Sequence, residues 1–340
     1  MSNSPDFLAG HAFRICANGP NPMQRLRILA LKTLGFLALA CCLGGCGQKE
    51  GSDPSSAWRV PLHAADNAAG KSQLDAAARH YRAAIAAFEQ SPDRDELSRG
   101  GDYARAVRGL ARTHASRGEI AKAEDLYRDL LKIQTPSLDR AGTSGRPVAM
   151  TLASLAELSL ARQDYESSEV LFLRILSMQT EGRVALEPDD WLLAYAYGGL
   201  GKTYAALGDS ARADSLAALS MSLRLYSQAF DLYLHEAFEE AEPAFRRALD
   251  FQTKHLGRDS PHVARTLHRL GWLLQIQQRP DEALTLYRDA ADILALGDDI
   301  LDRADVLEDI AALLRTSGEA GAADSASSAA AAVRAGAGEG

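Results

Sequence analysis

Apolar residues recur at helical spacing along most of the chain from about Leu74 onward, and no segment alternates with a period of two. A spacing near 3.6 residues places apolar side chains on one face of a helix, whereas a half-buried strand needs alternation. Prolines in this region are sparse and stand mostly at joints, such as Pro136, Pro147 and Pro261. The pattern therefore predicts an all-α fold.

The helical region repeats itself. A small residue precedes an alanine by twelve positions at Ala111 and Ala123, and again at Gly201 and Ala213. Small residues at both points allow two helix backbones to cross closely. The equivalent marker positions along the chain are Ala77, Ala123, Ser168, Ala213, Ala241, Ala283 and Ala323, separated by 46, 45, 45, 28, 42 and 40 residues.

This pattern resembles the tetratricopeptide repeat, and the best copy is Tyr197, Leu200, Gly201 and Tyr204 followed by Ala213. The resemblance implies an α-solenoid of about six helix-turn-helix units in a right-handed superhelix. Most intervals exceed the roughly 34 residues of an ordinary unit. The extra length follows the second helix, as at 256–262, and in this respect the chain resembles kinesin-light-chain-type repeats.

Two places depart from the regular pattern. The 28-residue step predicts that two helices over 211–234 are shortened or fused. The earliest second helix, with Ala77, Tyr81 and Ala84, lacks a predicted partner because Pro61 interrupts the segment before it. The repeat domain is therefore predicted over 71–325, with a low-complexity Ala/Gly tail over 326–340.

The N-terminal segment has the features of an export signal. Basic residues precede an apolar stretch at 33–43, which is too short for a typical transmembrane helix and suits a signal peptide. The sequence Leu43-Gly44-Gly45-Cys46 resembles a bacterial lipobox. That resemblance implies a lipoprotein signal peptide at 1–45, with Met23 as a possible true start, lipidation of Cys46, and a tether over 46–70. Because Gly47 rather than Asp follows the cysteine, it also implies the outer membrane, facing the periplasm.

Charge and composition exclude several classes of function. The net charge of -8 argues against nucleic-acid binding, which needs clustered basic residues. All four cysteines lie within the first 46 residues, so later segments contain no disulfide or Cys-ligated metal. The segment 198–203 contains Gly-Lys-Thr but has Ala196 where a phosphate-binding loop needs glycine, so no nucleotide is expected. His255, His262 and His268 lack metal-ligand spacing. We expect neither a cofactor nor catalytic residues.

The resemblance implies that the exposed sides of the first helices line a concave groove that holds a segment of another protein. The repeat register then assigns ten residues to this face: Arg105, Arg108, Arg112, Tyr195, Lys202, Tyr226, Phe230, Tyr233, His268 and Trp272. Two alternatives stay open, because the arginines also suit a solvated face and the aromatic residues also suit packing between repeats. If Phe230 and Trp272 line the groove, alanine at both positions should abolish partner capture and leave melting largely unchanged.

An alternative from another class is a cell-envelope hydrolase or carbohydrate-processing enzyme built on an α-helical toroid. Such an enzyme needs paired carboxylates that point inward from helix ends. Glu157 and Glu308 are the carboxylates that the pattern offers. The sequence favours the membrane-anchored scaffold over this enzyme.

Overall fold

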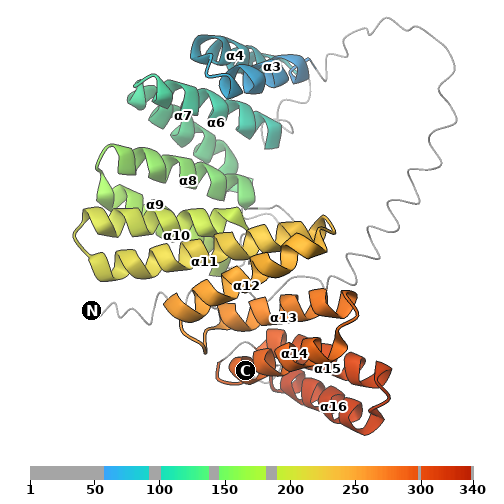
Figure 1. The fold of residues 1–340 in the computed structure, drawn as a ribbon. Helices are drawn as coiled ribbons and strands as arrows, with labels where there is room; N and C mark the ends of the chain where they lie inside the picture. Colours follow the sequence, from blue (N-terminus) through green and yellow to red (C-terminus); the bar gives the residue numbers. More distant parts are fainter. Residues whose placement is uncertain (1–56, 92–100, 138–144, 181–189, 298–299, 338–340) are drawn as a thin grey trace, which may run out of the picture. The chain divides into compact units, whose positions relative to one another are not determined.

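The structure is a computed structural model that describes residues 57–91, 101–137, 145–180, 190–297 and 300–337. These residues contain thirteen α-helices, one short 3₁₀ turn and no strand, which confirms the all-α prediction (Figure 1). The signal peptide, Cys46 and the tether up to residue 56 lie outside the described residues. Within the described ranges, no helix combines the length and apolar character needed to cross a membrane.

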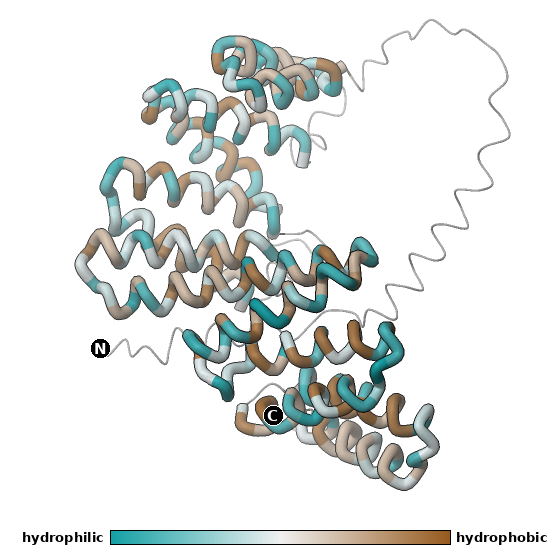
Figure 2. Tube along the Cα trace, in the orientation of Figure 1, coloured by the Kyte–Doolittle hydropathy of each residue, from teal (hydrophilic) through white to brown (hydrophobic). Residues whose placement is uncertain are grey.

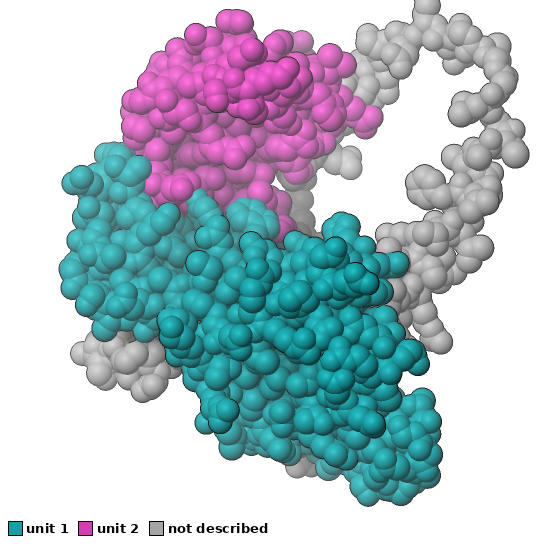
Figure 3. Space-filling model, in the orientation of Figure 1, with its two compact units in different colours: residues 1–17, 159–340 teal, residues 18–158 magenta. Residues whose placement is uncertain are grey.

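The described residues divide into two compact units, 57–158 and 159–337, and the division falls within one helix, α8 (Figure 3). The first unit contains α3 (Arg59–Gly70), α4 (Leu74–Gln90), α6 (Gly101–Ser116), α7 (Ile120–Gln134) and most of α8 (Arg146–Ala161). The second contains α9 (Tyr165–Thr180), α10 (Trp191–Ala206), α11 (Ser210–Leu234), α12 (Phe238–His255), α13 (Pro261–Ile276), α14 (Pro280–Leu294), α15 (Ile300–Thr316) and α16 (Ala320–Ala337).

One turn geometry recurs seven times between consecutive helices. In each turn a single residue adopts a left-handed backbone conformation, with φ between 58° and 85°. The amide of the following residue then donates to the carbonyl five residues earlier at 2.9 Å, as from Gln73 to Ala68 and from Arg279 to Leu274. This bond satisfies a carbonyl left open by the end of the first helix, which is the Schellman arrangement. The seven left-handed residues are Ser72, Gly118, Gln163, Gly208, Glu236, Gln278 and Gly318.

Every marker position of the sequence pattern follows such a turn by five residues and is the fourth residue of its helix. Six of the seven are 0% exposed, and Ala213 is 7% exposed. Figure 2 shows apolar and polar positions interspersed along many of the helices, as expected for helices that bury one side. The spacing of small residues therefore located the second helices correctly.

The structure corrects the start of the domain. Residues 59–70, predicted as tether, form α3, which pairs with α4 to make a complete first hairpin. Pro61 is the third residue of α3, where a backbone N–H has no intrahelical acceptor, so proline removes no helical hydrogen bond. The described residues therefore contain seven such turns, where about six units were predicted.

The structure specifies two further boundaries, of which the first was predicted as shortened or fused helices. The 28-residue step is explained by fusion, because α11 is one continuous helix of 25 residues that leads into α12 through the turn at Glu236. The predicted tail at 326–340 is helical as far as Ala337, since α16 extends over 320–337. The low side-chain cost of helix formation by alanine accounts for this extension.

Glycines allow large aromatic rings to pack against helix backbones. A Cβ atom added at Gly271 would lie 2.3 Å from the ring of Tyr287, and one added at Gly199 would lie 2.1 Å from the ring of Phe172. Gly201 instead faces backbone, with a Cβ position 3.3 Å from the carbonyl oxygen of Ala213. The predicted close crossing of Gly201 and Ala213 is thus present, whereas the glycine-ring contacts were not predicted.

Candidate functional site

Three arginines predicted for the ligand-facing side project from α6 in the first unit. Arg105, Arg108 and Arg112 are spaced three and four residues apart, which places them on one side of the helix. The opposite side of α6 is buried, with Val107, Leu110 and Ala111 in the core. We call these three residues the arginine face.

Arg105 is already paired within the protein. Its Nη2 atom donates to Asp66 at 2.7 Å, and Nη1 lies 3.6 Å from the carboxylate of Asp102. Asp66 also accepts a hydrogen bond of 2.8 Å from the Tyr81 hydroxyl. Burial, followed by this hydrogen bond, raises the pKa of Tyr81 to about 12. Arg105 is therefore part of a local polar network in which its charge is compensated.

Arg108 has a different environment. Its Nη2 atom lies 4.0 Å from the sulfur of Met150, and its Nη1 atom is buried without a hydrogen-bond partner among the described residues. Burial first, and then the neighbouring Arg112, lower the pKa of the Arg108 guanidinium to about 10. A buried N–H donor without an acceptor is energetically unfavourable.

Arg112 is exposed and forms no ion pair within the described part of the chain. Its charge is near enough to affect the pKa values of Tyr81 and Arg108. Arg108 and Arg112 therefore offer two neighbouring positive charges and at least one unused donor. Carboxylate and phosphate oxygens are the acceptors that guanidinium groups bind best.

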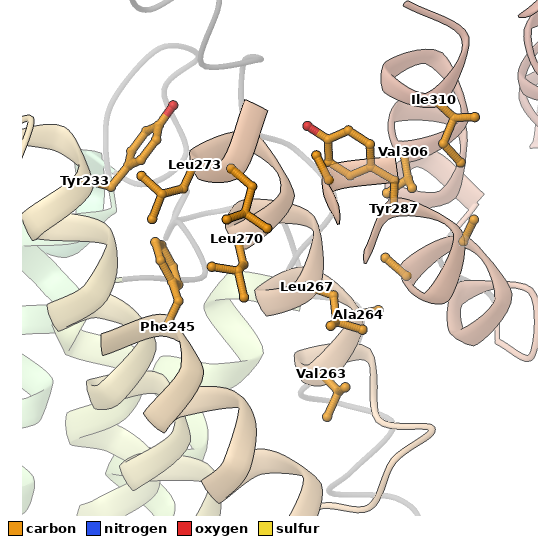
Figure 4. Packing of buried hydrophobic residues seen from close by; sticks show 14 of the residues in the cluster. Tyr233, Phe245, Val263, Ala264, Leu267, Leu270, Leu273, Tyr287, Val306 and Ile310 are labelled. Atoms are coloured by element: carbon orange, nitrogen blue, oxygen red, sulfur yellow. The ribbon is translucent and has the colours of Figure 1, made fainter. Parts of the chain in front are cut away.

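The predicted aromatic residues of α11 lie in the core of the second unit. Tyr226, Phe230 and Tyr233 are 4%, 6% and 8% exposed. The Phe230 ring stacks between the other two, with centroid distances of 6.0 and 5.9 Å. Figure 4 shows Tyr233 beside Phe245 and Leu273, among the buried residues of neighbouring helices. Of the two alternatives left open by the sequence, this geometry is that of packing between repeats.

The same rings contact Arg269 of α13, which was not among the predicted site residues. The guanidinium carbon of Arg269 lies 3.8 Å from the centroid of the Trp272 ring and 5.2 Å from that of Phe230. The Nε atom of Arg269 donates to the Tyr226 hydroxyl at 3.1 Å. Arg269 is three residues before Trp272, so helical spacing would have placed it on the same face. It holds α11 against α13.

Asp309 of α15 was not among the predicted site residues either. Its Oδ2 atom accepts a hydrogen bond of 2.6 Å from Nε1 of Trp272 and lies 2.7 Å from Nε2 of His268. Trp272 is partly buried and His268 is 9% exposed. These two predicted residues are therefore brought together with the α11 rings, and they join α13 to α15.

The remaining two predicted residues lie on α10. Tyr195 is partly buried and Lys202 is exposed. Neither residue belongs to the buried cluster that contains the α11 rings. Their helix also presents Trp191, which is 49% exposed and was not among the predicted residues.

The described residues form neither a metal site nor a phosphate-binding loop at the positions considered from the sequence. No group of three His, Cys, Asp or Glu side chains there could hold a metal ion. Lys202 and Thr203 lie inside α10, and the Thr203 hydroxyl donates to the Gly199 carbonyl at 2.9 Å as in an ordinary helix. Glu157 is exposed on α8, whereas Glu308 pairs with Arg334 of α16.

A surface hollow of about 620 Å³ lies at the turn between α10 and α11. Its polar groups bind one another. The Tyr204 hydroxyl donates to Glu169 at 2.5 Å, and Nε of Arg212 donates to Asp209 at 2.5 Å. The Arg212 guanidinium carbon also lies 4.2 Å from the Tyr204 ring centroid. These contacts secure the turn and leave no unused charged group pointing into the hollow.

One segment of the chain matches a known protein family. Residues 221–295 match the family model of the tetratricopeptide repeat, which confirms the predicted repeats in this segment. The segment runs from the middle of α11 to the end of α14. No curated protein sequence matches the chain. The matched segment contains the Phe230 and Arg269 contacts described above.

Several solved structures are similar to the chain. BtubC (BKLC) from P. vanneervenii is 18% identical, with 82% of this chain and 92% of that chain covered and a TM-score of 0.30. A Podospora anserina protein described as a kinesin light chain with nearly identical TPR-like repeats is 18% identical, with 72% and 97% covered and a TM-score of 0.40. The apo form of RapI is 14% identical, with 83% and 99% covered and a TM-score of 0.41.

Proposed function

We propose that this chain, which carries tetratricopeptide repeats at residues 221–295, is a lipid-anchored scaffold that binds a segment of another protein in the cell envelope. Stacked helical repeats present extended surfaces that suit protein binding. Lipidation of Cys46 would place the repeats at the outer membrane, facing the periplasm. In this proposal no residue is catalytic, and binding alone performs the function.

The arginine face carries the proposal. Arg108 is partly buried, its Nη1 donor has no acceptor among the described residues, and Arg112 beside it is exposed. A partner carboxylate at this position would accept hydrogen bonds from the exposed Arg112 guanidinium and lie near the positive charge of Arg108. Hydrogen bonds to charged groups contribute roughly 1.5–3 kcal/mol, which exceeds the contribution of an exposed ion pair. We therefore propose that the bound segment is acidic where it meets α6.

Replacing both Arg108 and Arg112 with glutamine should remove partner binding while the fold is retained. The measurement is crosslinked pull-down of the membrane form followed by mass spectrometry. Arg128→Gln is the matched control, because Arg128 is an exposed arginine of α7 already paired with Glu124. We expect Arg128→Gln to retain the wild-type partner and the double variant to lose at least nine-tenths of it.

Two results would count against this role of the arginine face. One is equal recovery of the partner by the double variant and the Arg128→Gln control. The other is a crosslinked partner segment that contains neither Asp nor Glu near the attachment point. Circular dichroism and melting of both variants distinguish loss of binding from loss of folding.

The anchor has a separate test. Cys46→Ala removes the only sulfur in the lipobox-like sequence, so the chain should remain unlipidated. A protein held by two or more acyl chains stays on its membrane, because each buried methylene contributes about 0.8 kcal/mol. We expect the wild type in the detergent phase and Cys46→Ala in the aqueous phase after phase partitioning. Persistence of the variant in the detergent phase would rule out this anchor.

A further inference from the structure

Helix α10 of the second unit has a narrow accessible strip. Ten of its sixteen residues are buried, and the six that remain accessible fall at helical spacing along one side. These six are Trp191, Tyr195, Gly198, Lys202, Ala205 and Ala206. Contacts with α9 and α11 cover the rest of the helix. The strip is therefore about one helix wide.

The strip begins with an aromatic pair whose orientation is fixed by the core. Trp191 is 49% exposed, and its ring meets that of Tyr195 edge-on at a centroid distance of 6.0 Å. Tyr195 in turn lies 6.3 Å from the ring of Phe172, which is 1% exposed. Asp190 caps the helix by accepting a hydrogen bond of 2.9 Å from the Leu192 amide. Trp191 is thus a large apolar group held in place at the surface.

Charge defines the other end of the strip. Lys202 is exposed, and α10 contains no acidic residue. Gly198 lies between the aromatic pair and Lys202, and a Cβ added there would lie 2.9 Å from the Ser220 hydroxyl oxygen of α11. Lys202 follows Trp191 by eleven positions, a distance of about 16 Å along the helix axis. An extended chain covers that distance in about five residues.

We propose that this strip binds an extended segment of a partner protein that places an apolar side chain on Trp191 and a carboxylate, about five residues away, on Lys202. The complementary charge of Lys202 selects an acidic partner, and the single-helix width suits an extended chain better than a helix, which needs a groove. A half-exposed tryptophan held by neighbouring rings is typical of residues that dominate binding. This surface extends the proposed function to the second unit and uses neither Arg108 nor Arg112.

A set of short peptides tests the proposal on the full chain. The parent peptide carries one Leu and one Asp five positions apart in a Gly/Ser background. Three control peptides replace Leu with Ser, replace Asp with Asn, or shorten the separation to two residues. Binding is followed by tryptophan emission, since Trp58 is 8% exposed and Trp272 is partly buried, whereas Trp191 is half-exposed.

We expect the parent peptide to bind at least ten times more tightly than each control peptide and to shift the emission to shorter wavelength. Trp191→Ala should abolish both effects, and Lys202→Gln should remove the preference for Asp over Asn. Arg108→Gln with Arg112→Gln should leave peptide binding unchanged, which separates this site from the arginine face. Circular dichroism and melting of Trp191→Ala should match the wild type.

Three outcomes would overturn the proposal. The first is equal binding of parent and control peptides, or no binding by any of them. The second is Trp191 emission in the free chain that acrylamide does not quench, because the ring would then be covered. The third is a concentration-dependent dimer in sedimentation that Trp191→Ala abolishes, because a second copy of the chain would then occupy the strip.

Discussion

Phe230→Ala is expected to lower the free energy of unfolding by about 3–5 kcal/mol, the usual range for removing a buried aromatic ring. Phe230 is 6% exposed and stacks on both Tyr226 and Tyr233. Its ring also faces the Arg269 guanidinium at 5.2 Å. Alanine would leave a cavity among these groups and remove one aromatic face from Arg269, whose Nη1 atom is buried without a partner in the described residues.

Thermal and denaturant unfolding measure this effect, and Trp191→Ala is the matched control. Both variants delete a large aromatic ring from a helix of the second unit, but Trp191 is 49% exposed. We expect the control to change stability by less than about 1 kcal/mol. Equal melting of the two variants would show that the ring of Phe230 does not contribute to the core.

This expectation differs from the sequence-based one, in which Phe230 lined a groove and its removal left melting unchanged. The register that placed Phe230 on the first-helix face assumed a separate first helix. In the structure that helix is the second half of α11, and its rings pack against α12 and α13. Which of two faces an aromatic residue occupies depends on the neighbouring helices, and the periodicity of one helix does not encode it.

The sequence located the helices well because small residues are required at helix crossings. The marker at Ala77 was correct although its partner helix was not predicted. The recurring turn was missed for a physical reason. Glycine is the usual signal for a left-handed residue, yet only three of the seven turns have it, at Gly118, Gly208 and Gly318. At the other four the Schellman hydrogen bond holds a residue with a side chain in that conformation.

The sequence predicted which residues share a side of a helix, but not which residues pair between helices. The register grouped Arg105, Arg108 and Arg112 correctly on one side of α6. It could not show that Asp66 neutralises Arg105, because 39 residues separate the two. Asp309 was missed for the same reason, since it meets Trp272 from a different hairpin. Helical spacing predicts which residues share a face, whereas pairing across hairpins depends on how the hairpins stack.

The second large effect is expected from Gly271→Ala, which should destabilise the protein by about 1–3 kcal/mol, the range for overpacking a core. An added Cβ would lie 2.3 Å from a ring carbon of Tyr287, so the ring must move. Tyr287 is 0% exposed, and its hydroxyl donates to Gln275 at 3.0 Å. Packing on all sides and this hydrogen bond oppose a shift of the ring.

Gly321→Ala is the matched control for Gly271→Ala, since no atom lies within 4 Å of an added Cβ at Gly321 in α16. Alanine is favoured over glycine inside a helix by about 0.8–1 kcal/mol, so this control should be neutral or stabilising. Opposite signs for the same substitution would show that ring contact, not helix propensity, decides the outcome at Gly271. Combining Gly271→Ala with Tyr287→Leu should cost less than the sum of the single changes, because the smaller side chain removes the clash. Strict additivity would mean that Gly271 and the Tyr287 ring are not in contact.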